Sequence, residues 1–177
     1  IIDVITKAYA AKLINDNEFN EIFFAQAKKI EKDYEKQEVL IVGVLKGAFV
    51  FVSDLVRNIN LDLSLDFIAV SSYGMSTESS GVVKINKDIE MDLSGKNVII
   101  VEDIIDTGLT LKYIKDYLSG KNAKSVRICT LLDKPSRRKC DVDVDYVGFE
   151  IEDLFIVGYG IDCKEKYRNL PYIAYIQ

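Results

Sequence analysis

The segment around residues 98–110 carries the clearest hydrophobic pattern of the chain. Four branched apolar residues in a row, at 98–101, predict a strand that is buried on both faces. Glu102 and Asp103 follow, then two more apolar residues and the segment 106–110. Apolar residues then recur at helical spacing, at Leu111, Ile114, Tyr117 and Leu118. The pattern therefore predicts a strand that runs through a short loop into a helix.

The same order of strand, loop and helix occurs earlier in the chain. Residues 39–45 form a nearly continuous apolar run, which again predicts a buried strand. Lys46 and Gly47 separate this run from a predicted helix, whose apolar face is formed by Phe49, Val52, Leu55, Val56 and Ile59. Two such units in one chain are typical of an α/β protein.

Further strands and one more helix complete the pattern. Residues 61–69 alternate between apolar and polar, which predicts a strand with one polar face, and 126–132 predict another buried strand. An amphipathic helix starts at Asp16 or Asn17, either of which can cap it, and reaches about residue 36. We expect a mostly parallel, twisted sheet flanked by helices, with ligands at the carboxyl ends of its strands.

The last part of the chain has a different pattern. From residue 146 onward the apolar runs are short and no long helix is predicted; the runs lie at 147–149, 154–159 and 172–176. We expect a small hood formed mainly by residues 146–177, with a contribution from the N-terminus. A length of 177 residues predicts one domain, residues 1–177.

Composition and charge exclude several classes of protein. Apolar residues make up 49% of the chain, as in soluble globular proteins, and no apolar run approaches the roughly 20 residues that span a bilayer. With 23 basic and 28 acidic residues the net charge is −5, so we expect neither a nucleic-acid nor a membrane partner. Three cysteines without a Cys-x-x-Cys pair predict free thiols in a reducing cytoplasm. Because histidine is absent, acid–base chemistry falls to Asp, Glu, Lys or Tyr.

The loop 106–110 is suited to an anion. It lies at a predicted helix N-terminus, where backbone N–H groups point outward. Gly108 allows a ligand close to the backbone, and Thr107 and Thr110 add hydroxyl donors. A phosphate monoester is the expected ligand. Lys46 and Gly47 follow the end of another parallel strand, so a second anion site is expected in the same crevice.

Glu102 and Asp103 would repel a phosphate unless something lies between them and it. A sugar diol and a divalent cation are the two candidates, and a phosphorylated ribose with Mg²⁺ would supply both. The alternative is that the two acids are ordinary solvated residues at the end of a strand. The co-occurrence of the apolar run, the acid pair and the phosphate-type loop favours a site.

A long polar segment at residues 71–81 interrupts the compact pattern, and residues 82–85 can form a short strand after it. Connections of this length in an α/β protein are commonly lids or disordered segments. The pattern leaves two interpretations open, a lid over the expected site and a flexible loop without a function.

Residues 98–110 closely resemble the phosphoribosyl diphosphate (PRPP) signature of type I phosphoribosyltransferases, in particular that of the hypoxanthine-guanine phosphoribosyltransferases of bacterial type. Further matches to this family extend from residue 39 onward in the family's order. The resemblance implies the family's α/β fold with a hood. It also implies Mg²⁺-dependent transfer of ribose 5-phosphate from PRPP to N9 of hypoxanthine or guanine.

The resemblance also implies roles for individual residues. Asp106, Thr107, Gly108, Leu109 and Thr110 would hold the 5-phosphate, with Asp106 also the candidate general base or proton partner at N7 of the purine. Glu102 and Asp103 would orient the ribose and the metal, and Asp162 would assist a second Mg²⁺. The remaining matches are the pyrophosphate residues Lys46, Gly47 and Arg168, with a cis peptide bond between Leu45 and Lys46. Ser72 and Tyr73 match the family's mobile lid, at about 71–84, which would exclude water when the site closes.

Four residues match the family's purine site: Lys134, Phe155, Ile156 and Asp162. Lys134 would donate to the 6-oxo group, Phe155 would lie on the face of the base, and the backbone of Ile156 would lie near its edge. A donor at Lys134 favours 6-oxopurines over adenine.

Two other functions remain open from the sequence. One is a xanthine-preferring transferase, and the other is a non-enzymatic PRPP-sensing regulator, although no nucleic-acid-binding addition is recognisable. Kinases and dinucleotide dehydrogenases are disfavoured because neither glycine-rich motif is present. The family's habit implies a homodimer or homotetramer.

Overall fold

A computed structural model describes residues 10–14, 16–72 and 83–176. Its main sheet has six strands in the order β4-β3-β2-β5-β6-β7. All neighbours pair in parallel except β4, which is antiparallel to β3 at one edge. The strands are β2 (Val39–Leu45), β3 (Leu63–Ser72), β4 (Val83–Lys87), β5 (Asn97–Ile105), β6 (Ser125–Asp133) and β7 (Tyr146–Glu150). The predicted fold class is confirmed.

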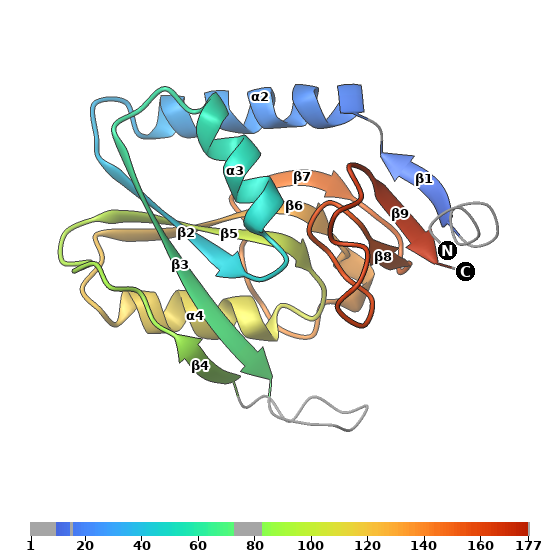
Figure 1. The fold of residues 1–177 in the computed structure, drawn as a ribbon. Coiled ribbons are helices and arrows are strands. Elements are labelled where there is room, and N and C mark those ends of the chain that lie inside the picture. Colours follow the sequence, from blue (N-terminus) through green and yellow to red (C-terminus); the bar gives the residue numbers. More distant parts are fainter. Residues whose placement is uncertain (1–9, 15, 73–82, 177) are drawn as a thin grey trace.

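Helices cover both faces of this sheet, as Figure 1 shows. The helices α2 (Asp16–Asp33) and α3 (Phe49–Asn58) lie on one face, and α4 (Leu109–Ser119) lies on the other. A short 3₁₀ helix, η1 (Pro135–Arg137), follows β6. No helix in the described part of the chain is long and apolar enough to cross a membrane.

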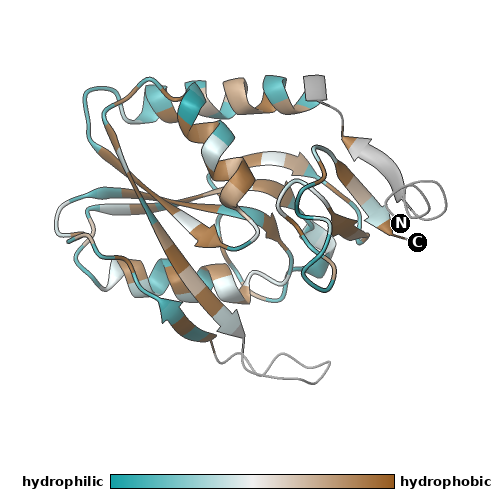
Figure 2. Cartoon of the chain, in the orientation of Figure 1, coloured by the Kyte–Doolittle hydropathy of each residue, from teal (hydrophilic) through white to brown (hydrophobic). Residues whose placement is uncertain are grey.

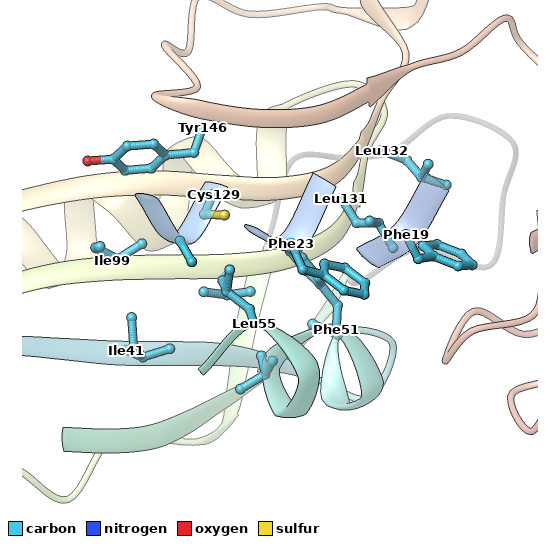
Figure 3. Close-up of a cluster of buried hydrophobic side chains, with 14 of the residues drawn as sticks. Phe19, Phe23, Ile41, Phe51, Leu55, Ile99, Cys129, Leu131, Leu132 and Tyr146 are labelled. Atoms are coloured by element: carbon cyan, nitrogen blue, oxygen red, sulfur yellow. The ribbon is translucent and has the colours of Figure 1, made fainter. Parts of the chain in front are cut away.

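Each face of the sheet has its own hydrophobic cluster. Under α2 and α3, aromatic and aliphatic side chains pack against the strands, as Figure 3 shows for Phe23, Phe51, Leu55 and Ile99. Under α4, the alternate side chains of the same strands meet Leu111, Ile114 and Leu118. Strands whose two faces are both covered can be apolar at successive positions. Figure 2 shows the hydrophobic colouring along β2, β3 and β5.

A second sheet of three antiparallel strands lies beside the carboxyl ends of the main strands (Figure 1). Its order is β1-β9-β8, with β1 at Ala10–Ile14, β9 at Ile173–Ile176 and β8 at Phe155–Val157. The expected hood therefore contains a strand from near the N-terminus. Its expected start at residue 146 was wrong, because residues 146–150 form β7, which pairs with β6 in the main sheet.

Two element boundaries differ from expectation near residues 98–110. The strand β5 continues to Ile105, so Glu102 and Asp103 lie within it. The pairing of β5 with β6 extends as far as Ile105 and Asp133. The helix α4 begins at Leu109, so Leu109 and Thr110 form its first turn. Parallel pairing with β6 extends the strand through the acid pair.

The predicted lid falls between β3 and β4. Ser72 is the last residue of β3, and Val83 is the first residue of β4. Tyr73 and the rest of 73–82 lie outside the described residues. The role of this segment stays a prediction.

Candidate active site

The parallel pairing of β2 with β5 places the two predicted anion loops at the carboxyl ends of neighbouring strands. Gly47 lies directly against Asp103: a Cβ atom added at Gly47 would lie 1.7 Å from Asp103 Oδ2. Only a residue without a side chain fits there. The loop after β2 and the acid pair of β5 therefore form one crevice at the carboxyl end of the sheet.

The loop after β2 has the backbone feature that the family resemblance implied. The peptide bond between Leu45 and Lys46 is cis. The Lys46 ammonium lies 3.1 Å from Glu165 Oε2, and both side chains are mostly exposed. The hydrogen bond from Lys46, assisted by Arg168, lowers the pKa of Glu165 below its ordinary value. Lys46 is thus held at the rim of the crevice by an anion that a ligand can replace.

Arg168 reaches the same crevice from the segment between β8 and β9. Its Nη1 donates to the carbonyl oxygen of Gly160 at 2.8 Å, and its Nη2 lies 2.7 Å from Asp162 Oδ1. A Cβ atom at Gly160 would lie 2.1 Å from the carbonyl oxygen of Gly47. The backbone of this segment therefore contacts the loop after β2 directly, and Arg168, Lys46 and Asp162 gather on one side of the crevice.

Glu102 and Asp103 are buried carboxyl groups, only 9% and 8% exposed. Burial raises the pKa of Glu102 well above its ordinary value, and the adjacent Asp103 carboxylate raises it further. Burial also raises the pKa of Asp103. Two carboxyl groups that are costly to ionise together suit hydrogen bonding to hydroxyls or a hard divalent cation. The alternative of ordinary solvated acids is wrong.

The described residues contain no ready-made metal cluster of three or more His, Cys, Asp or Glu side chains. Asp162 is paired with Arg168 rather than with the two buried acids. A cation at Glu102 and Asp103 would therefore need oxygen atoms from a ligand or water to complete its shell.

A pocket lies at the point where β5 passes into α4. It is lined by Glu102, Ile104, Ile105, Asp106, Thr107, Gly108, Thr110 and Leu111. Gly108 has a φ of 81°, a left-handed conformation that favours glycine, and it precedes the first turn of α4. The hydroxyl of Thr107 accepts a long hydrogen bond, 3.4 Å, from the amide of Leu109. The predicted phosphate loop thus forms a concave wall at a helix N-terminus.

Asp106 has a cationic partner that the sequence did not indicate. Arg137 donates from Nε to Asp106 Oδ1 at 3.0 Å, and both side chains are about half exposed. The basic character of residues 133–139 was visible in the sequence, but the contact joins residues 31 positions apart. Glu165, the partner of Lys46, was missed for the same reason.

Three of the four predicted purine residues, Lys134, Phe155 and Ile156, lie near one another, and the fourth, Asp162, is paired with Arg168. Lys134 is 7% exposed, and its Nζ donates to the carbonyl oxygen of Leu154 at 2.6 Å. Phe155, the next residue, is 56% exposed, whereas Ile156 is buried. The ammonium of Lys134 can donate a hydrogen bond to a flat heterocycle. The exposed ring of Phe155 can stack against the same heterocycle.

Comparison with known proteins gives one consistent family. The family of the phosphoribosyl transferase domain matches residues 11–164. The hypoxanthine-guanine phosphoribosyltransferase of Bacillus subtilis strain 168 is 48% identical over 165 residues, covering 93% of this chain and 92% of the relative.

Solved structures agree with this match. A hypoxanthine-guanine phosphoribosyltransferase from Bacillus anthracis, with HEPES in its active site, has a TM-score of 0.92 at 53% identity and covers 96% of this chain and 99% of its own. A hypoxanthine phosphoribosyltransferase from Staphylococcus aureus has a TM-score of 0.94 at 44% identity, covering 98% and 95%. The chain therefore belongs to the phosphoribosyltransferase family, among its hypoxanthine-guanine members.

Proposed function

We propose that this chain transfers the 5-phosphoribosyl group of PRPP to N9 of hypoxanthine and guanine, giving IMP or GMP and pyrophosphate. The observation that carries the proposal is that two anion loops follow neighbouring parallel strands, β2 and β5, on either side of a buried acid pair that Gly47 contacts. This arrangement suits a ligand with phosphate at both ends and a diol in the middle.

At one end, the amides and hydroxyls of residues 106–110 would hold the 5-phosphate. This assignment is supported by the concave wall at the start of α4 and by the left-handed conformation of Gly108. The positive end of the helix dipole adds attraction for the phosphate.

In the middle, Glu102 and Asp103 would accept hydrogen bonds from the ribose hydroxyls. The buried acid pair also fits Mg²⁺, which when bound would neutralise the carboxylates and the phosphate oxygens of PRPP. Asp162, held by Arg168, would assist a second ion through pyrophosphate or water.

At the other end, Lys46, the amide of Gly47 and Arg168 would stabilise the departing pyrophosphate. Charge that develops on a leaving group is best stabilised by donors already in place. Arg168 is held by Gly160 and Asp162, and a pyrophosphate oxygen can replace Glu165 as the partner of Lys46.

For the base, Lys134 would donate to the 6-oxo group while Phe155 stacks on the ring and the backbone of Ile156 lies at its edge. Asp106 would accept or share the purine proton at N7. The lid, with Ser72 and Tyr73, would exclude water that could otherwise capture the ribosyl cation.

We place this reaction in the cytoplasm, which suits the free thiols of Cys129, Cys140 and Cys163. A homodimer or homotetramer is the expected assembly. Phe24 and Phe49 support it, because both rings are exposed, 58% and 45%, on helices α2 and α3.

An absorbance assay with PRPP and Mg²⁺ tests the function, offering hypoxanthine, guanine, xanthine, adenine and uracil separately. We expect nucleotide formation with hypoxanthine or guanine, and its loss when EDTA removes the metal. Faster turnover of xanthine would reassign the enzyme's base. Binding of PRPP without turnover of any base would instead indicate a PRPP-sensing regulator.

A further inference from the structure

The segment 137–140 lies against the back of the phosphate loop and donates hydrogen bonds to its carbonyl oxygens. Arg138 Nη1 donates to the carbonyl oxygen of Asp106 at 3.1 Å. The next carbonyl, of Thr107, accepts from the amide of Lys139 at 2.9 Å and lies 3.7 Å from the sulfur of Cys140. Two successive carbonyls of the loop are therefore held from the same side.

The guanidinium of Arg138 is itself anchored. Its Nη2 donates to Asp133 Oδ1, and the two side chains are only 20% and 11% exposed. Asp133 ends β6 and is fixed between two strands, with register partners Ile105 on β5 and Glu150 on β7. Arg138 thus connects a rigid position of the sheet to the phosphate loop.

This connection determines where the amides of the loop point. In a trans peptide unit the C=O and the N–H of the following residue point in opposite directions. With the carbonyls of Asp106 and Thr107 directed toward 137–140, the amides of Thr107 and Gly108 point away from that segment. The methylene groups of Arg138 also limit the loop, since a Cβ atom at Gly108 would lie 2.9 Å from Arg138 Cδ.

We propose that Arg138 is a positioning residue for phosphate binding: anchored on Asp133, it fixes the Asp106–Thr107 peptide so that the loop amides face the 5-phosphate of PRPP. The inference deepens the proposed function and rests on it. Arg138 contributes through the orientation of the backbone, and Asp133 contributes although it lies on β6 rather than in the phosphate loop.

The test compares Arg138→Met with Arg138→Lys and with the control Lys139→Met. Calorimetry measures PRPP affinity in the presence of Mg²⁺, and kinetics measures the KM for PRPP and for hypoxanthine. Loss of a charged hydrogen bond predicts PRPP binding about tenfold weaker in Arg138→Met, with the KM for hypoxanthine unchanged. Arg138→Lys, which keeps one donor, recovers part of the loss. Lys139→Met leaves PRPP affinity unchanged, because Lys139 contacts the loop through its backbone amide.

The isosteric variant Asp133→Asn tests the anchor, and it carries the test alone if Arg138→Met does not fold. We expect weaker PRPP binding in Asp133→Asn, and no further loss when both substitutions are combined. Two results would overturn the proposal. One is unchanged PRPP affinity in Asp133→Asn and in any folded Arg138→Met. The other is a double variant in which the two losses of affinity multiply. If the unsubstituted chain binds PRPP but converts no base, the enzymatic function fails while the affinity test still decides the role of Arg138. If it does not bind PRPP, both fail.

Discussion

Gly47 has no room for a side chain, because the Asp103 carboxylate occupies the position that a Cβ atom would take. Gly47→Ala must therefore displace either the acid or the loop after β2. A displacement of about 1 Å at reacting groups can cost roughly 100-fold in rate, so we expect kcat/KM for PRPP to fall by about that factor.

Gly120→Ala is the matched control for this substitution. Gly120 follows α4 in a right-handed conformation, and the atoms nearest to its Cβ position lie 3.4 Å away or farther. The activity of the Gly120→Ala variant should match that of the unsubstituted chain. Normal PRPP kinetics in Gly47→Ala would mean that the loop and Asp103 separate without functional cost.

Glu102 predicts a separation of stability from activity. Its pKa is higher in the folded chain than the ordinary value of 4.5, so its stabilising contribution is present below that value and is lost as pH rises through the folded pKa. Glu102→Gln removes this pH dependence. We expect the variant to unfold about 2–4 °C higher near pH 8, with a smaller gain near pH 5 and with reduced activity.

Thermal unfolding with EDTA at the two pH values measures this effect. Glu150→Gln, on exposed β7 surface, serves as the control for loss of an acid. If Glu102→Gln does not raise the unfolding temperature near pH 8, the ionised Glu102 carboxylate does not destabilise the folded chain.

Substitution of Asp106 should affect kcat and PRPP affinity differently. Asp106→Asn keeps the backbone of the phosphate loop but cannot accept a proton, so we expect kcat to fall by about 100-fold or more while PRPP affinity is kept. Stopped assays and calorimetry measure the two quantities. Equal losses in both would make Asp106 a structural loop residue, held in place by Arg137.

The helix α3 fixes the loop after β2 because its apolar face packs on the sheet. Leu55 is fully buried in the cluster of Figure 3. Leu55→Ala should lower the free energy of unfolding by about 2–5 kcal/mol, measured by urea denaturation, because a cavity forms. Ser53→Ala, on the exposed face of the same helix, should change it little. A small effect at Leu55 would mean that the core collapses around the missing atoms.

Elements with strong local patterns could be predicted from the sequence. The apolar run 39–45 coincides with β2, and the helical spacing after residue 110 coincides with α4. The assignment of 146–150 to the hood failed because a short run does not reveal which distant strand it pairs with. The contacts of Arg137 and Arg138 with the phosphate loop were hidden for the same reason.

Arg168 connects the segment after β8 to the crevice of the main sheet. Arg168→Gln removes the hydrogen bond to Gly160 and the ion pair with Asp162. We expect the KM for PRPP to rise about tenfold or more, with the KM for hypoxanthine unchanged.

Arg127→Gln is the control, since Arg127 also bridges distant elements through Asp33, Asp145 and Tyr146 but lies outside the proposed site. It should lower the unfolding temperature without changing the KM for PRPP. Parallel changes in both variants would mean that Arg168 acts only through stability.

The pairing of β1 with β9 has a consequence for the order in which the protein matures. Residues 10–14 are synthesised early, yet their partner strand is residues 173–176. All six strands of the main sheet have been translated by residue 150. The main sheet can therefore form while β1 still has no partner, because the pairing of β1 with β9 must close a loop over most of the described chain. Arg168 lies shortly before β9, so the capacity to use PRPP should arise only once this second pairing has formed, and a chain with the main sheet alone should be compact but inactive.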